Sequence, residues 1–373
     1  MIAVAACSTA STYALERVVA LKNGRATVVV GEAIVEGPDG GVMLQSADGG
    51  LHILTADQIE SRSSDDAPLE MLDAEALAEQ LLAETPPGFQ IHQSTNYVIC
   101  YNTTRTYARW CSSLLERLQK SFIAFWKKQG CDVRPPEHPL PVLVFGDQNS
   151  YARHAKDELG ASAGAVIGFY SLASNRVMMY DLTGNQSLQR EAGVRGSLHD
   201  ISALLSLPEA EPLVATIVHE ATHQIAYNCG LQTRFADNPL WLSEGLAAFF
   251  ETPDLSRSRA WAGIGQVNYS RWDRFQDAYA ARRTVPLQRL LLDDALLRNR
   301  DTAVDGYAQA WAWNYFLIRW RPKQYAAYLQ ALAVKPRLLR DSPERRLADF
   351  QEHFGDDFGE LETDFQRRMS RIR

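Results

Sequence analysis

Cysteine is scarce in this sequence, and long apolar runs are missing from it. The 373 residues include five cysteines, and their spacing has none of the paired patterns that bind a structural metal. Thiols scattered so thinly do not require disulfide bonds. Because no run of about 18 apolar residues occurs, we expect no segment that spans a membrane. The five cysteines are Cys7, Cys100, Cys111, Cys131 and Cys229.

An excess of basic residues is also missing. Lysine and arginine number 38 against 45 aspartates and glutamates, which gives a net charge of −7, and the basic residues are scattered rather than clustered. This pattern argues against nucleic acid as the main partner. Hydrophobic residues make up 46% and charged residues 22% of the chain, as in a globular protein with a large core. The length suggests two or three domains.

The N-terminal residues 1–7 are apolar but lack the basic segment and longer apolar run of a full signal peptide. The last four, Val4-Ala5-Ala6-Cys7, resemble a bacterial lipobox, which lies early in the chain unless the true start is upstream. On this resemblance we expect an exported bacterial protein, periplasmic, cell-surface or secreted, with an N-terminal lipid anchor. A cytoplasmic location is the alternative.

Hydrophobic periodicity divides the chain into four parts, which together predict an α+β fold. Residues 12–62 alternate short β-runs with glycine-rich turns and predict a small β-barrel or β-sheet module. Residues 63–88 are rich in Ser, Asp and Ala and predict a linker with one short helix. Residues 89–255 mix strand and helix patterns and form the expected catalytic region. Residues 256–373 are nearly all helical in pattern and should pack on that region.

Individual elements can be predicted from the same periodicities. Short strands are expected in the N-terminal module at 17–20, 26–30, 33–35, 42–45 and 51–54. Amphipathic helices are expected at 104–129, 303–320, 322–334, 342–354 and 356–372.

The most informative segment is His219-Glu220-Ala221-Thr222-His223, which has the pattern H-E-x-x-H. Apolar residues recur around it at helical spacing, Pro212 suits a first turn, and Gly230 follows the last turn, so a helix is predicted. Two histidines four apart on a helix project from one face and can reach one metal ion. Glu220 would then point to the side where a metal-bound water lies. The alternative is an exposed polar face with two ordinary histidines.

A catalytic metal usually has a third protein ligand, and Glu244 is the best candidate. Asn238 can cap and Pro239 can start a second helix, which runs to about Glu251. Glu244 would lie in the middle of this helix among apolar neighbours, where an unpaired carboxylate is costly unless a metal compensates its charge. The alternative is an ion pair with an arginine such as Arg234.

The sequence resembles the gluzincin metallopeptidases. The resemblance rests on H-E-A-T-H followed by W-L-S-E-G-L-A-A-F-F-E, and it is best to the peptidase-MA-like group of bacterial proteins, over roughly residues 89–373. It implies one Zn²⁺ ion per chain, with His219, His223 and Glu244 as ligands. It also implies that Glu220 acts as a general base toward the zinc-bound water.

The sequence departs from this family at one position. Enzymes of the thermolysin type carry an aspartate four residues after the ligand glutamate, where this chain has Ala248. Glu251, seven residues after Glu244 and again on the ligand face, is the candidate carboxylate that orients a ligand histidine. A solvent-facing glutamate at the helix end is the alternative.

The resemblance further implies a hydrogen-bond donor for the oxyanion that develops on the substrate. Gluzincins often use a Tyr or His well downstream of the ligand glutamate, and Tyr307 matches that position. The alternative is that Tyr307 is a core residue in a helical aromatic run with Trp311 and Tyr315.

Residues 164–182 predict two strands around a Ser/Asn turn. In gluzincins an edge strand borders the cleft and pairs with the substrate backbone. The candidate edge strand comprises Val177, Met178, Met179 and Tyr180. The alternative is an internal strand without substrate contact.

These features predict a zinc-dependent peptide hydrolase whose partner is a peptide or protein substrate. The G-x-M-E-N strand with which gluzincin aminopeptidases hold the substrate amine is not found, which favours an endopeptidase. One alternative is a catalytically inactive binding or scaffold protein that keeps the fold. Another is a zinc hydrolase of a non-peptide amide or ester. The oligomeric state stays open.

Overall fold

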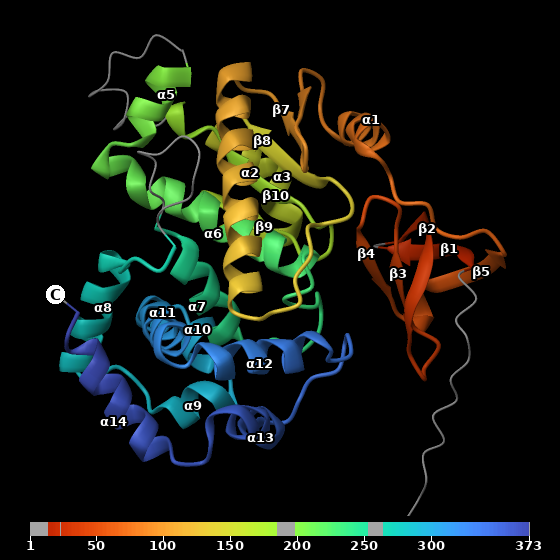
Figure 1. Cartoon of the computed structure of the whole chain (residues 1–373). Coiled ribbons are helices and arrows are strands. Elements are labelled where there is room, and N and C mark those ends of the chain that lie inside the picture. The colour runs from red at the N-terminus through yellow and green to blue at the C-terminus, as the bar shows by residue number, and fades with distance from the viewer. Residues whose placement is uncertain (1–13, 23, 185–197, 253–263, 373) are drawn as a thin grey trace, which may run out of the picture.

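The structure, a computed structural model, describes residues 14–22, 24–184, 198–252 and 264–372. It has the predicted α+β class, with two β-sheets in the first half of the chain and helices dominating the second half (Figure 1). The lipobox-like segment lies outside the described residues. None of the helices in the described part of the chain is long and apolar enough to cross a membrane.

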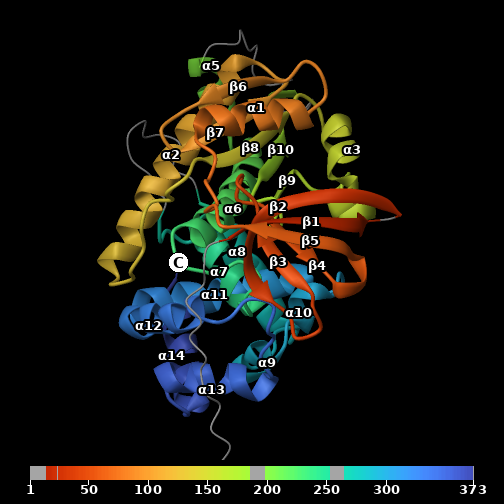
Figure 2. The same cartoon turned by 90° about the vertical axis from the view of Figure 1, so that its right-hand side faces the viewer.

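The N-terminal module is an antiparallel sheet with the strand order β4-β3-β2-β1-β5 (Figure 2). Its small core consists of Val18, Val29, Val42 and Leu44. The strands are β1 (Leu15–Lys22), β2 (Arg25–Glu36), β3 (Val42–Gln45), β4 (Leu51–Leu54) and β5 (Ile59–Asp65), with a short 3-10 helix η1 (Ala56–Gln58) before β5.

Two details of this module differ from the sequence prediction. The runs predicted at 26–30 and 33–35 form one strand, β2, whose pairing register shifts between Ala33 and Val35. Strand β5 was not predicted, and it extends into the segment 63–88 that was predicted to be a linker. Its residues after Ile59 are exposed and polar, so it has no apolar alternation from which a strand could be predicted.

The second sheet has the order β6-β7-β8-β10-β9. Its three inner strands are parallel, and the two outer strands run antiparallel to their neighbours. Its elements are α1 (Ala74–Glu84), β6 (Gln90–Gln93), β7 (Tyr97–Tyr101), α2 (Arg105–Lys128), β8 (Leu140–Phe145), α3 (Gln148–Leu159), η2 (Gly160–Ser162), β9 (Gly168–Tyr170), β10 (Val177–Tyr180) and η3 (Leu182–Gly184).

Both faces of this sheet are covered. Alternate strand residues such as Ile99, Val142 and Met179 belong to the main core, which includes the apolar faces of α2 and α6. The residues between them, such as Leu143 and Met178, pack with α1 and α3 in a second core. The sheet therefore provides a fixed platform for α6, the helix that carries the H-E-x-x-H segment.

The prediction that residues 177–180 form the edge strand is wrong. Strand β10 is paired on both sides, in parallel with β8 and antiparallel with β9, so β9 occupies the edge. Val177, Met178 and Met179 are buried, as expected for an internal strand covered on both faces.

The second half of the chain packs helices against α6. The predicted helix at 303–320 is confirmed as α11, and those at 322–334, 342–354 and 356–372 are confirmed within three residues at either end. The elements are α5 (Leu198–Leu205), η4 (Pro208–Ala210), α6 (Glu211–Asn228), α7 (Leu240–Phe250), α8 (Tyr269–Ala280), α9 (Leu287–Leu292), α10 (Ala295–Arg298), α11 (Ala303–Trp320), α12 (Pro322–Ala333), α13 (Pro343–Phe354) and α14 (Phe358–Met369).

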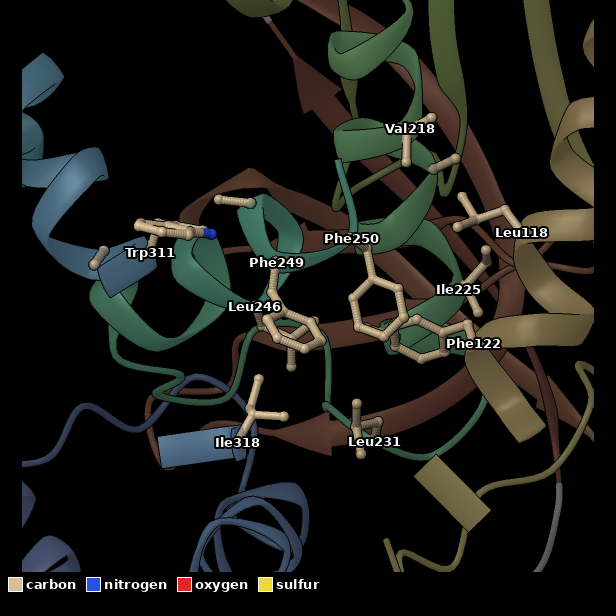
Figure 3. Close-up of a cluster of buried hydrophobic side chains, with 14 of the residues drawn as sticks. Leu118, Phe122, Val218, Ile225, Leu231, Leu246, Phe249, Phe250, Trp311 and Ile318 are labelled. Carbon is tan, nitrogen blue, oxygen red and sulfur yellow. The ribbon is translucent and has the colours of Figure 1, made fainter. Parts of the chain in front are cut away.

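The main core joins the second sheet and its helices to the helices of the second half of the chain. Figure 3 shows Phe249 and Phe250 of α7 beside Phe122 of α2, and the ring centroids of Phe122 and Phe250 lie 4.7 Å apart. Trp311 of α11 is fully buried in the same core. Helix α7 is thus held between α2 and α11, which fixes the position of any side chain that it carries toward α6.

The N-terminal module contacts the rest of the chain through the turn between β3 and β4. The guanidinium of Arg234, a buried residue, donates to the carbonyl oxygen of Gly49 at 2.8 Å and to that of Leu172 at 3.2 Å. The backbone N–H of Leu51 donates to the carbonyl of Ala173 at 2.7 Å. The turn is therefore linked to Leu172 and Ala173, in the loop that directly follows the edge strand β9.

Candidate metal centre

Helix α6 presents one polar stripe to a cleft. Its first turn contains Pro212, and it ends at Asn228, with Gly230 in a left-handed conformation two residues later. The apolar stripe faces the core, and the opposite stripe lines a cleft of about 670 Å³. The residues of α6 that line this cleft are Thr216, His219, Glu220, His223 and Tyr227.

Three side chains converge in this cleft. Nε2 of His219 lies 3.2 Å from Nε2 of His223 and 3.0 Å from Oε2 of Glu244. Nε2 of His223 lies 3.6 Å from the same oxygen of Glu244. Within the described residues, this is the group of three His, Cys, Asp or Glu side chains that could hold a metal ion.

These separations fit one small tetrahedral ion. Ligand atoms that lie about 2.1 Å from a tetrahedral zinc ion are about 3.4 Å from one another. The three observed separations of 3.0, 3.2 and 3.6 Å bracket that value. Two nitrogens and one carboxylate oxygen are also a donor set that zinc prefers, and three protein ligands leave a fourth position open.

The carboxylates around His219 favour positive charge at this point. Burial alone would lower the pKa of His219, but its hydrogen bonds with Glu244 and Glu251 raise it to about 10. Arg234, the alternative partner considered for Glu244, bonds to backbone carbonyls elsewhere. In the structure Glu244 contacts His219 and His223, and the hydroxyl of Tyr307 is a further hydrogen-bond partner of this carboxylate.

Glu251 lies beside His219, one of the two candidate ligand histidines. Its Oε2 lies 2.8 Å from Nδ1 of His219. Its other oxygen accepts hydrogen bonds from Nδ2 of Asn268 at 2.8 Å and from Nε of Arg271 at 2.7 Å. Burial opposes the charge of Glu251, but the contacts with His219 and Arg271 lower its pKa to about 2. An ionised carboxylate here orients the His219 ring.

Glu220 lies in the same cleft beside the edge strand. Its Oε2 accepts a hydrogen bond of 2.8 Å from the backbone N–H of Tyr170 in β9. The backbone N–H of the next residue, Ser171, donates to the carbonyl oxygen of Arg176, toward the sheet. Because successive N–H groups of a strand point in opposite directions, the N–H of Tyr170 points away from the sheet at its edge. Burial raises the pKa of Glu220, which makes this carboxylate a better proton acceptor.

Tyr307 borders the metal centre. The centroids of its ring and that of His219 lie 6.5 Å apart, and the guanidinium of Arg271 lies over the Tyr307 ring at 5.7 Å. Burial raises the pKa of its phenol, and the nearby carboxylates of Glu244 and Glu220 raise it further. The hydroxyl therefore keeps its proton and can donate a hydrogen bond into the cleft.

The N-terminus of α7 is capped from another part of the chain. Asn238 does not cap it as predicted, because the Asn238 side chain bonds to the carbonyls of Thr233 and Ala236. Instead, Oδ1 of Asp294 accepts a 3.0 Å hydrogen bond from the N–H of Leu240. The cap ties the start of the Glu244 helix to the turn before α10.

The residue after Glu244 allows an unusually close helix contact. A Cβ atom on Gly245 would lie 2.0 Å from Nδ2 of Asn314 and 2.4 Å from the carbonyl oxygen of Ala310, both in α11. The Asn314 amide also donates to the carbonyl of Trp241 at 3.0 Å. Since α11 also carries Tyr307, this contact fixes Glu244 and Tyr307 relative to each other.

Sequence reasoning missed several residues of the centre. No local pattern indicated four groups that come from elements outside α6 and α7. They are the backbone N–H of Tyr170 and the side chains of Asn268, Arg271 and Asp294. The predicted edge strand 177–180 does not line the cleft, whereas Tyr170 of β9 does.

Comparison with known proteins finds a family match over the candidate metal centre. The profile of a family described as a protein of unknown function (DUF1570) matches residues 213–338. That stretch contains the His219, His223 and Glu244 group together with Glu220, Glu251 and Tyr307, and it leaves out both sheets. No curated protein matches the sequence. The family match therefore coincides with the metal centre and its helices but supplies no activity.

Proposed function

We propose that this chain is a zinc-dependent peptide hydrolase of the gluzincin type. His219, His223 and Glu244 would hold one zinc ion, and Glu220 would act as the general base. The observation that carries the proposal is the placement of the three ligand atoms 3.0 to 3.6 Å apart, beside a carboxylate that does not belong to the group.

The surrounding residues support hydrolysis rather than metal storage. Zinc, when bound, lowers the pKa of a coordinated water to about 7 and polarises a carbonyl. The raised pKa of Glu220 suits it to take up a proton in the cleft and to pass it to a leaving amine. The protonated hydroxyl of Tyr307 suits it to donate to an oxyanion. A site that only bound metal would need neither group.

The cleft favours an endopeptidase over an aminopeptidase. An aminopeptidase needs an acidic group that is free to hold the substrate amine. Among the described residues that line the cleft, the other carboxylates already have cationic partners. Glu251 bonds to Arg271, and Asp237 and Asp294 both bond to Arg346.

The proposal is tested by metal analysis combined with digestion of a broad peptide library. We expect one zinc per chain in the wild type and much less in His223→Ala. We expect Glu220→Gln to keep its zinc but to lose hydrolysis by about 10²-fold to 10⁴-fold, because the amide preserves size and cannot accept a proton.

Three outcomes would count against this function. Equal zinc in the wild type and in His223→Ala would remove the metal assignment. Zinc binding without hydrolysis of any peptide would favour a binding protein, and hydrolysis of esters alone would favour a non-peptide substrate.

A further inference from the structure

Two arginines line the same cleft as the metal centre and take no part in it. Arg298 is the last residue of α10, and Arg340 lies in the loop between α12 and α13. We propose that Arg298 and Arg340 form a carboxylate-binding subsite, which selects substrates with a carboxylate near the scissile bond. This inference rests on the proposed function, because it concerns the substrate of that site.

The loop that carries Arg340 is anchored on both sides. Ala236 and Arg337 form an isolated antiparallel bridge, and the N–H of Leu338 donates to the carbonyl of Phe235 at 2.8 Å. Directly after Arg340, Asp341 forms an ion pair with Lys335. Arg340 is therefore presented at the cleft from a fixed backbone rather than from a free loop.

Phe235 and Leu338 both adopt positive φ angles, 61° and 63°, at this contact. Residues other than glycine rarely adopt such angles, and when they do the surrounding structure usually enforces them. Both side chains line the cleft. The backbone at Phe235 and Leu338 therefore forms the part of the cleft wall next to Arg340.

Of these two arginines, Arg340 has no counter-charge among the described residues, and Arg298 shares its one carboxylate with another arginine. Arg346 pairs with both Asp237 and Asp294, with N–O distances of 2.7 and 3.0 Å. Arg298 reaches Asp294 through one nitrogen at 3.3 Å, and its side chain is 60% exposed. Arg340 is exposed and pairs with none of the described residues.

An anion is the ligand that such a pair would recognise. A guanidinium presents a planar set of N–H donors that matches a carboxylate in two-point contact. In a peptide substrate, a carboxylate comes from an Asp or Glu side chain or from the C-terminus. A cation would be repelled, so the same pair would also discriminate against Lys and Arg near the scissile bond.

The test compares matched peptides as substrates of the zinc-loaded enzyme. Each pair differs only by Glu or Gln at one position, and a second series differs only by a free or an amidated C-terminus. We expect kcat/KM to be roughly 2-fold to 5-fold higher for the carboxylate member of one pair, the scale of exposed ion pairs. The series that shows the effect identifies the source of the carboxylate.

Variants assign the preference to the two arginines. Arg298→Ala and Arg340→Ala should each reduce the Glu/Gln or free/amidated ratio, and Arg340→Glu should reverse it. Arg300→Ala, an exposed arginine just after α10 that does not line the cleft, should keep the wild-type ratio. The ratio should also fall toward one at about 1 M salt, where exposed charges are screened.

Failure of this inference can be told apart from failure of the proposed function. If the wild type hydrolyses peptides but every ratio is near one, the subsite is wrong and the hydrolase proposal stands. An equal loss of preference in Arg300→Ala would also overturn the subsite. If no peptide is hydrolysed at all, both proposals fall.

Discussion

Nδ1 of His219 lies 2.8 Å from a carboxylate oxygen of Glu251, and this contact determines which nitrogen of the ring faces the cleft. With the proton held on Nδ1, the lone pair of Nε2 is available to a metal. Glu251 is itself held by Asn268, which caps α8, and by Arg271 in the first turn of α8. The geometry of the candidate metal centre therefore depends on a helix that supplies none of the three candidate ligands.

Glu251→Gln should weaken zinc binding without removing a ligand. The amide keeps the size of the side chain but loses the negative charge that orients and polarises His219, so affinity should fall by about 10-fold to 100-fold. Competition with a chelator of known affinity measures this change. Glu352→Gln, an exposed glutamate on α13, is the control, and equal affinity in both variants would show that Glu251 does not support the centre.

Tyr307→Phe should lower kcat by about 10²-fold, the scale of one lost oxyanion donor. KM should change little, because the hydrogen bond strengthens only as charge develops on the substrate. Tyr315→Phe removes a hydroxyl from the same helix and serves as the control. A normal kcat in Tyr307→Phe, with an effect on thermal stability alone, would assign Tyr307 to the core.

Gly245→Ala should destabilise the protein by about 3 kcal/mol, because the new Cβ meets α11 and the core must move to admit it. Its nearest atoms would be Nδ2 of Asn314 at 2.0 Å and the carbonyl oxygen of Ala310 at 2.4 Å. Gly164→Ala is the matched control, since its Cβ would have no neighbour within 4 Å. Equal unfolding midpoints in denaturant for the two variants would disprove the close contact.

Asp237→Asn should remove a part of the stability that depends on pH. Burial raises the pKa of Asp237, but the hydrogen bonds from Arg346 outweigh it and lower the pKa below 3.8. A carboxyl whose pKa is lowered by folding stabilises the protein above its unfolded pKa, and this contribution is lost as the pH falls through the folded pKa. Near neutral pH, the free energy of unfolding of the wild type should therefore be about 3 kcal/mol higher than that of the variant, which is the scale for breaking a buried ion pair.

Denaturant unfolding in the presence of a chelator measures this difference without a contribution from bound metal. The gap between the two proteins should stay constant down to about pH 5 and narrow below about pH 4. A gap that does not change with pH would mean that Asp237 is not the titrating group.

The convergence of the three candidate metal ligands could be predicted from the sequence because its signals are local. His219 and His223 are one helical turn apart, and Glu244 is a charged residue in an otherwise apolar helix. The position of Glu251 could also be predicted, because it follows Glu244 at helical spacing. The long helices of the second half, such as α11, were predictable because each has a sustained apolar face.

The remaining parts depend on contacts between distant segments. Asp294 caps a helix 54 positions earlier, and Arg271 meets Glu251 only after the chain has folded back. Strand order is likewise a tertiary property, although the unbroken apolar run Val177–Tyr180 was typical of an internal strand. Strand β5 gave no signal, since its residues after Ile59 are polar and exposed and show no apolar alternation.

The guanidinium of Arg234 links the N-terminal module to the loop after β9, because it donates hydrogen bonds to the backbone carbonyls of Gly49 and Leu172. Every residue type offers the same carbonyl, so these two hydrogen bonds depend on the path of the two loops and on Arg234 rather than on the side chain at position 172. A change in loop length would move the carbonyls out of reach. Across related sequences, we therefore expect the number of residues in the β3–β4 turn and in the loop after β9 to be kept, together with Gly49, whose φ is 79°, and Asp48, which pairs with Arg176 at 3.2 Å.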